Sequence, residues 1–206
     1  GLHIVDEAFV RVHINLLAVP GATLDDVTEA HSHLVLLPQC QGFLKQNNIR
    51  GRVSPDNARA AREVAEKAEK HSAALASELA AEIYGLDVLA RHIEDHDQNT
   101  TRFLIMAKDA DTSRRAERMM TSFVFEVRNI PAALYKGMGG FATNGVNMTK
   151  LESYMLDGSF TATQFYADIE GHPDDRNVEL ALEELAYFTS HLKILGVYPA
   201  DPRRAP

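Results

Sequence analysis

A polar stretch beside a hydrophobic run holds the residues best suited to chemistry. The stretch is Gln98-Asn99-Thr100-Thr101-Arg102, and residues 103–106 continue it as an apolar strand. An arginine binds a carboxylate through two parallel hydrogen bonds, and asparagine and threonine add neutral donors. Polar groups at strand ends commonly line the ligand crevice of α/β folds. The pattern alone indicates either a site for a small carboxylate or a polar strand end with a surface arginine.

The histidines and the single cysteine are weaker candidates. His92 and His96 stand four residues apart, but their neighbours are typical of a strand and a turn, and no third metal ligand is placed. His31 and His33 face the same way only in an extended chain. No base stands beside Cys40, which favours a buried thiol over a nucleophile. The sequence also has no glycine-rich phosphate loop, so we expect neither a metal nor a bound cofactor.

Composition limits the class of partner. Hydrophobic residues make up 45% of the chain and charged residues 24%, and the formal net charge is -8. The negative charge argues against a nucleic-acid partner, and no apolar run is long enough for a membrane span. A single cysteine fits a reducing compartment. We therefore expect a cytoplasmic location and a small-molecule partner.

The elements that must position the polar stretch alternate in type along the first half of the chain. A half-buried strand is predicted over residues 9–19, a short helix capped by Thr23 over 23–31, and a helix beginning at Ser54-Pro55-Asp56. A small-residue strand or turn at 72–77 precedes a helix that Gly85 closes. Further strands are predicted at 86–93 and 102–108. Such alternation predicts an α/β layer with partly parallel pairing.

The second half follows a charged, non-periodic stretch at residues 108–118. Strands are predicted over 121–127, 146–156, 160–170 and 193–199, and helices over 131–145 and 176–192. Asp157-Gly158 is typical of a two-residue hairpin turn. The order βαββαβ is that of a ferredoxin-like unit. We therefore predict two domains, 1–109 and 119–200, with a linker at 110–118 and a tail at 201–206.

These motifs together resemble the prephenate dehydratase family over essentially the whole chain. The matching segments, in the family's order, are Ser32-His33, Gln39-Cys40, residues 73–86, residues 99–103 and residues 145–153. The resemblance implies a two-lobed catalytic domain similar to a periplasmic binding protein, of which residues 1–109 are part. It implies that residues 119–200 form an ACT regulatory domain. The expected fold class is therefore α/β followed by α+β.

The implied activity is conversion of prephenate to phenylpyruvate in L-phenylalanine biosynthesis, without a cofactor. Thr101 matches the family's essential threonine, Arg102 is expected to hold a substrate carboxylate, and Phe103 to form an apolar wall or simply to pack. Expulsion of a hydroxide-like group needs a donor at the leaving oxygen. A threonine hydroxyl is a weak acid, so a hydrogen bond or proton relay is expected. The remaining expected pocket residues are Asn99, Ser32, His33 and Gln39.

The second domain resembles ACT domains that bind phenylalanine between subunits, which implies feedback inhibition and a homodimer or homotetramer. Backbone N–H groups at the start of the helix near Pro131 are expected to hold an amino-acid carboxylate. Ala132 stands where the family has glycine, and Tyr154-Met155 stands where it has arginine-proline. The expected effector residues are Pro131, Ala132, Ala133, Leu134, Asn147, Met148, Glu152 and Ser153.

Two other functions stay open from the sequence. A non-catalytic amino-acid sensor would use the ACT module alone and would have no need of Thr101. An arogenate dehydratase would perform the same chemistry on a substrate with an amino group. Family chains open with a segment that supplies one wall of the crevice, and this chain begins where that segment should end. We therefore expect little activity from these 206 residues alone, and exposed apolar surface near 4–19 and 102–107 unless a partner covers it.

Overall fold

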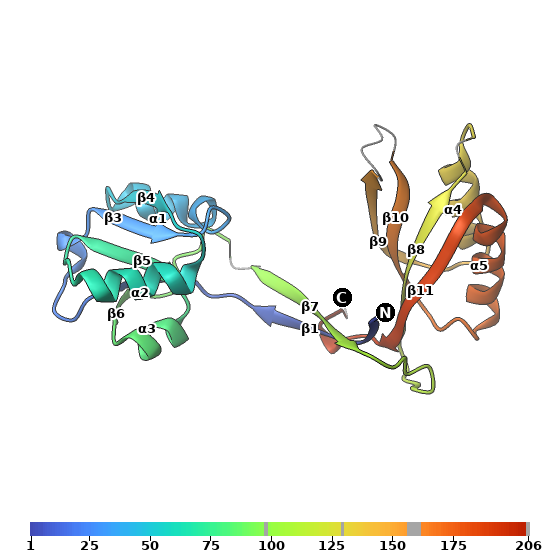
Figure 1. Ribbon diagram of the computed structural model, residues 1–206, viewed down its shortest axis with the longest axis horizontal. Coiled ribbons are helices and arrows are strands. Elements are labelled where there is room, and N and C mark those ends of the chain that lie inside the picture. The colour runs from blue at the N-terminus through green and yellow to red at the C-terminus, as the bar shows by residue number, and fades with distance from the viewer. Residues whose placement is uncertain (97–98, 129, 156–161, 205–206) are drawn as a thin grey trace. The chain divides into compact units, whose positions relative to one another are not determined.

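The computed structural model divides the chain into two compact units, each described by itself (Figure 1). The described residues are 1–96, 99–128, 130–155 and 162–204. The central unit comprises residues 10–101, and the terminal unit comprises residues 1–9 together with 102–206. The chain thus passes between the units twice, within strand β1 (His3–Arg11) and within strand β7 (Thr100–Ala107). The sequence instead predicted one passage, at residues 110–118, which belong to the terminal unit.

The central unit is built on a five-stranded sheet in the order β4-β3-β5-β2-β6. Strand β3 pairs in parallel with β4 and β5, whereas β2 is antiparallel to β5 and β6. The strands are β2 (Asn15–Ala18), β3 (Glu29–Ser32), β4 (Arg50–Val53), β5 (Ser72–Ala76) and β6 (Asp87–Ala90). The helices are η1 (Leu24–Asp26), η2 (Leu37–Cys40), α1 (Gln41–Gln46), α2 (Asn57–Lys67) and α3 (Glu78–Tyr84).

Local chemistry explains most of these elements. Strands β2 and β5 are buried along their whole length. Strands that are covered on both faces carry continuous runs of small and apolar residues, as these two do. The predicted single alternating strand at 9–19 is therefore wrong: it splits into the end of β1 and the fully buried β2. Helix α2 forms as predicted, but its cap is Asp56, whose Oδ1 accepts the N–H of Arg59 at 2.7 Å. The predicted helix at 23–31 is only the short η1, and β3 follows it.

Several strands of this sheet end at the same edge, which we call the carboxyl edge. The parallel strands β3, β4 and β5 all finish there, at Ser32, Val53 and Ala76. Helices α2 and α3 begin within a few residues of those ends. Asn15 pairs with Ala76, so the antiparallel β2 begins at the same edge. Ligands of open α/β sheets commonly bind beyond the carboxyl ends of the strands.

The terminal unit contains a six-stranded sheet in the order β7-β1-β11-β8-β10-β9. Helices α4 and α5 cover one face of it, and their core includes Phe123, Phe125, Phe141 and Leu185 (Figure 1). Besides β1 and β7, the elements are β8 (Met119–Val127), α4 (Ala133–Thr143), β9 (Met148–Met155), β10 (Ala162–Glu170), α5 (Arg176–Phe188), β11 (Thr189–Pro199) and η3 (Pro202–Arg204).

The predicted βαββαβ order is present as β8, α4, β9, β10, α5 and β11. Two further strands, β1 and β7, extend the sheet beyond β11. The last strand begins at Thr189 and not at 193, because the helix ends at Phe188 and Thr189 already has an extended backbone. The predicted turn at Asp157-Gly158 lies outside the described residues.

The expectation of exposed apolar surface holds for only one of the two segments. Phe103, Ile105 and Met106 on β7 are about half exposed. Within 4–19 the apolar side chains are mostly buried, and only Val10 stays largely exposed. In the described parts of the chain, no helix has the length and hydrophobicity that a membrane span requires.

Candidate functional site

Two predicted pocket residues, Ser32 and His33, both form hydrogen bonds with Asn57 at the carboxyl edge. Ser32 Oγ lies 2.9 Å from Asn57 Oδ1 and 3.2 Å from the carbonyl oxygen of Leu75. The backbone N–H of His33 donates to the same Asn57 Oδ1 at 2.9 Å. Ser54, just after β4, has a buried hydroxyl for which the described residues provide no partner. The edge is therefore lined by neutral hydrogen-bonding groups.

The other predicted pair, Gln39 and Asn99, is also brought together. Asn99 Nδ2 donates to Gln39 Oε1 at 2.8 Å across 60 residues of sequence. The backbone carbonyl of Asn99 accepts the N–H of Val12 at 2.9 Å, which joins the two chain segments that leave the central unit. Gln39 and Asn99 line a pocket of about 200 Å³ together with Glu94 and His96.

A contact between a histidine and a carboxylate beside this pocket was not predicted from the sequence. His13 Nδ1 lies 2.9 Å from Glu94 Oε1, and the N–H of Ile14 donates to Glu94 Oε2 at 3.0 Å. Burial acts to raise the pKa of Glu94, but these hydrogen bonds outweigh it and lower the pKa. The rings of His13 and His92 stack with centroids 4.0 Å apart. No spacing signal reveals this group, because His13 and Glu94 are 81 residues apart.

Thr101 and Arg102, adjacent in the sequence, belong to different units. Thr101 is exposed on β7 at the end of the central unit. Arg102 binds protein groups of the terminal unit: its Nε donates to Glu7 at 2.7 Å, and its two terminal nitrogens donate to Asp168 and to the Tyr198 hydroxyl. The guanidinium is thus engaged by the protein in this structure. Its expected contact with a substrate carboxylate stays a prediction.

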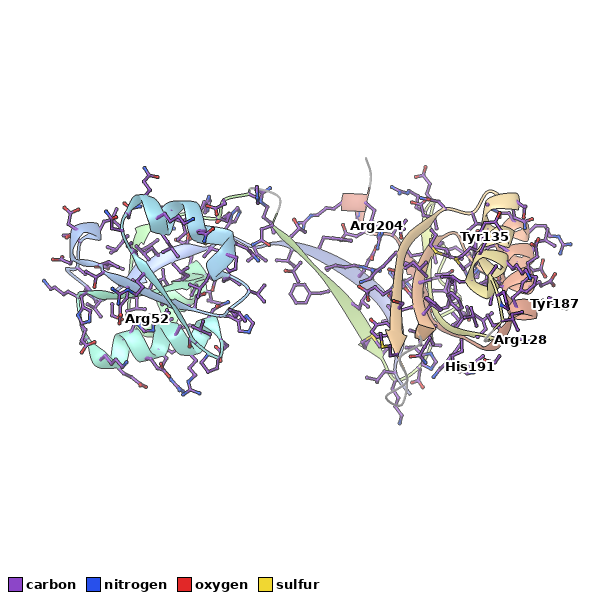
Figure 2. All side chains as sticks on the ribbon, turned by 90° about the horizontal axis from the view of Figure 1, so that it is seen from above. Arg52, Arg128, Tyr135, Tyr187, His191 and Arg204 are labelled. Atoms are coloured by element: carbon purple, nitrogen blue, oxygen red, sulfur yellow. The ribbon has the colours of Figure 1, made fainter. Side chains whose placement is uncertain are left out.

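A buried network surrounds Arg102. The side chains of Glu7 and Asp168 are fully buried. Arg204 from η3 (Figure 2) also binds Glu7, and Ser122 Oγ lies 2.6 Å from the Tyr198 hydroxyl. Burial raises the pKa of Tyr198 to about 12, and the Asp168 charge adds to the rise. Burial acts to lower the pKa of Arg102, but the contact with Asp168 and the charges of its other partners outweigh burial and raise it.

Phe103 and Cys40 are further predicted residues. Phe103 is 53% exposed on β7 and belongs to none of the hydrophobic clusters of the described structure. Cys40 is buried, and burial raises the pKa of its thiol to about 12, with Asp95 and Glu94 adding to the effect. The prediction of a buried thiol is therefore confirmed. Among the described residues, no group of three or more His, Cys, Asp and Glu side chains is placed to hold a metal ion.

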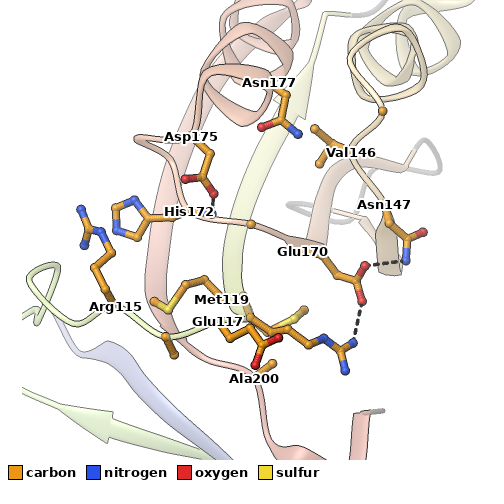
Figure 3. Close-up of a pocket in the computed structure, with 15 residues that line it drawn as sticks. Arg115, Glu117, Met119, Val146, Asn147, Glu170, His172, Asp175, Asn177 and Ala200 are labelled. Carbon is orange, nitrogen blue, oxygen red and sulfur yellow. Dashed lines mark hydrogen bonds and ion pairs between the residues drawn. The ribbon is translucent and has the colours of Figure 1, made fainter. Parts of the chain in front are cut away.

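The expected effector residues do not meet within one chain. Residues 131–134 lie at the start of α4, whereas Asn147 follows its other end. Asn147 lines a pocket of about 400 Å³, where its Nδ2 donates to Glu170 at 3.1 Å and Arg118 binds the same carboxylate at 3.2 Å (Figure 3). His172 also lines this pocket, and its buried Nε2 has no partner among the described residues.

The altered motif of β9 makes contacts of its own. The Tyr154 hydroxyl donates to Glu152 Oε2 at 2.8 Å, and Lys150 Nζ lies 3.1 Å from Glu152 Oε1. The hydrogen bond from Tyr154 and then that from Lys150 lower the pKa of Glu152. Met148 begins this strand, and Ser153 is exposed near its end. At the start of α4, Ala132 has a left-handed backbone with φ of 60°.

The chain is similar in sequence to a known protein family and to proteins of described activity. Residues 1–111 match the family described as prephenate dehydratase. The chain is 49% identical to a bifunctional N-acyl-homoserine lactone acylase/prephenate dehydratase of Komagataeibacter europaeus, over 100% of the chain and 74% of that protein. It is 36% identical to arogenate dehydratase/prephenate dehydratase 1 of Arabidopsis thaliana, over 97% of the chain and 55% of that protein.

A solved structure of prephenate dehydratase from Arthrobacter aurescens in complex with L-Phe is similar to the whole chain. The TM-score is 0.88 at 28% sequence identity, over 97% of this chain and 67% of that structure. The similarity extends to residues 112–206, which the family match does not include.

Proposed function

Because the chain belongs to the prephenate dehydratase family, we propose that it catalyses, as part of a complete crevice, the decarboxylating dehydration of prephenate to phenylpyruvate. The observation that carries the proposal is that the central unit brings the predicted residues together in two groups. Ser32 and His33 share one amide partner, and Gln39 bonds Asn99 two residues before Thr101. The chain spans about half the length of the plant relative, so the activity of the whole protein is part of this proposal.

The proposed chemistry requires a donor at one oxygen atom. The bond from the ring to its carboxylate breaks and releases carbon dioxide, and its electrons enter the ring as the carbon–oxygen bond to the hydroxyl breaks. The departing oxygen takes a proton that comes from solvent and leaves as water, and the ring becomes aromatic. Thr101 donates a hydrogen bond to the departing oxygen, where negative charge develops. The pocket groups hold the substrate so that this hydroxyl is aligned.

Replacement of the Thr101 hydroxyl tests the proposal in the full-length natural protein. We expect Thr101→Val to lower kcat for prephenate about 100-fold or more, because a positioned hydrogen-bond donor at a developing negative charge contributes this much. Thr101→Ser keeps the hydroxyl and should retain most of the activity. Thermal unfolding of both variants should match that of the unchanged protein, since Thr101 is exposed. Normal turnover by Thr101→Val would remove Thr101 from the mechanism.

The terminal unit is proposed to be an ACT module that binds L-phenylalanine and inhibits the reaction. Its ferredoxin-like strand order and the L-Phe complex of the Arthrobacter relative support this assignment. The effector residues at the two ends of α4 would then meet across a homodimer or homotetramer. Isothermal titration with L-phenylalanine should release or absorb measurable heat. No binding at millimolar concentration would contradict the assignment.

The descriptions of two relatives suggest two alternative substrates. The Arabidopsis protein is described as an arogenate dehydratase as well as a prephenate dehydratase, so arogenate should be assayed beside prephenate. The Komagataeibacter relative is described as an acylase as well, so hydrolysis of an N-acyl-homoserine lactone should also be measured. The ratio of kcat/KM values decides between the substrates.

A further inference from the structure

The side-chain amide of Asn57 is held in one orientation at the carboxyl edge. Its Oδ1 accepts from the Ser32 hydroxyl and from the backbone N–H of His33, each at 2.9 Å. A backbone N–H can only donate, so the atom that faces it must be the amide oxygen. The Nδ2 group therefore points the other way with two N–H donors, and it makes no hydrogen bond to the described residues.

This amide borders a pocket that adjoins the predicted site. Asn57 lines a pocket of about 370 Å³ together with His13. His13 binds Glu94, and Glu94 lines the neighbouring pocket of Gln39 and Asn99. The contact between His13 and Glu94 thus connects the two pockets, and the free amide donors of Asn57 lie beside the group of residues expected to hold substrate.

The charge around Asn57 explains why a neutral donor is useful there. Asp56 also lines the pocket, and one of its oxygens caps α2 by accepting the N–H of Arg59. The partial positive charge of the helix start offsets this carboxylate. His13, which lines the same pocket, is engaged by the Glu94 carboxylate at 2.9 Å. Amide N–H groups bind a substrate carboxylate through charge-assisted hydrogen bonds without adding net charge.

We infer that Asn57 is a substrate-binding residue whose Nδ2 donates to a carboxylate of the substrate, and that Ser32 and His33 are positioning residues that hold its amide. The inference rests on the proposed dehydratase function and deepens it. It also changes the expected roles of Ser32 and His33, which act here through Asn57. Nothing in the sequence pattern singled out Asn57, because its two partners lie 24 and 25 residues away.

The Asn57→Asp variant of the full-length protein separates donation to substrate from support of the fold. It keeps an oxygen that accepts from Ser32 and His33, removes the two N–H donors and adds negative charge. We expect KM for prephenate to rise about 10- to 100-fold with kcat changed less than about 3-fold, because the lost bond holds a charged group. Lower pH should partly restore KM, since a protonated carboxyl is again a neutral donor.

Two further variants serve as controls for Asn57→Asp. Asn48→Asp makes the same chemical change at an exposed residue of the central unit and should leave KM unchanged. Ser32→Ala should raise KM less than Asn57→Asp, because it removes only one of the bonds that hold the amide. Unchanged KM in an active Asn57→Asp variant, or a loss of kcat accompanied by a lower unfolding temperature, would overturn the inference alone. If the unchanged protein neither converts prephenate nor binds it in calorimetry, the proposed function fails and the inference fails with it.

Discussion

At the scale of single residues, Arg102 is held by two carboxylates that water does not reach. Glu7 and Asp168 are fully buried, and Arg102 is the side chain that contacts both. A buried charge that loses its partner keeps the cost of its desolvation without the compensating attraction. The stability of the terminal unit therefore depends on this guanidinium, whatever its role toward substrate.

Substitution of Arg102 should accordingly be costly. We expect Arg102→Leu to lower the free energy of unfolding of the terminal unit by about 3–5 kcal/mol, measured by urea denaturation. The matched control is Arg52→Leu in the central unit (Figure 2), which breaks the exposed pair with Glu29 and should lower the free energy of unfolding of that unit by about 1 kcal/mol or less. Adding Asp168→Asn to Arg102→Leu should recover part of the loss. Equal losses for Arg102→Leu and Arg52→Leu would contradict this account.

The sequence could predict some residues of the site but not others. Ser32, His33, Gln39 and Asn99 were found through family motifs, and the structure brings them together in two pairs. Asn57, His13 and Glu94 were missed, because each acquires its importance from a partner far along the chain. The contacts of Arg102 were missed for the same reason: Glu7 and Asp168 lie on strands whose pairing no local pattern specifies.

At the scale of elements, the start of helix α4 carries a strained backbone. Ala132 adopts the left-handed conformation with φ of 60°, which costs an L-residue with a Cβ about 1–2 kcal/mol. Glycine adopts the same conformation without this penalty. The residue therefore contributes unfavourably to the stability of the element that carries the expected effector residues.

Relief of this strain should be measurable. We expect Ala132→Gly to raise the free energy of unfolding of the terminal unit by about 1 kcal/mol in urea denaturation. Ala142→Gly, at an exposed position in the last turn of the same helix, should lower it by up to about 1 kcal/mol, because glycine has a lower helix propensity than alanine. The two substitutions are chemically identical and opposite in expected sign. Destabilisation by both would show that the conformation of Ala132 is not strained.

The sequence predicted some helices and strands better than others. Residues typical of helix starts and ends located α2 and α3, and the apolar face of α5 located that helix, although its end was predicted at residue 192 instead of Phe188. Strand β2 is buried on both faces and β1 continues into another unit, so one alternating pattern could not describe them. The addition of β1 and β7 to the second sheet arises from tertiary pairing and had no local signal.

At the scale of the whole molecule, the second sheet ends in a strand with an open edge. Strand β9 has a partner only on its β10 side among the described strands, and Leu151 and Tyr154 are both more than 40% exposed on it. Unpaired edges with apolar side chains are ready surfaces for pairing with a second copy. The proposed homo-oligomer is therefore expected to use this strand.

A charge on β9 tests this expectation. We expect Leu151→Glu to shift the protein toward the monomer in light-scattering measurements of molar mass, because like charges would face each other across the paired edges. Ile83→Glu, at an exposed position of α3 in the central unit, should leave the molar mass unchanged. A molar mass for Leu151→Glu equal to that of the unchanged protein would place the contact elsewhere.

The pairing of β1 with β11 also has a consequence for synthesis of the chain. Ile4 pairs with Gly196, so the terminal unit joins the first strand described here to the last. At typical translation rates, β1 waits roughly 10 to 40 seconds on the ribosome before its partner emerges. The central unit is continuous from residue 10 to residue 101 and can close during that time. The growing chain should therefore acquire the carboxyl edge first, and the buried charges around Arg102 only after its last strand is released.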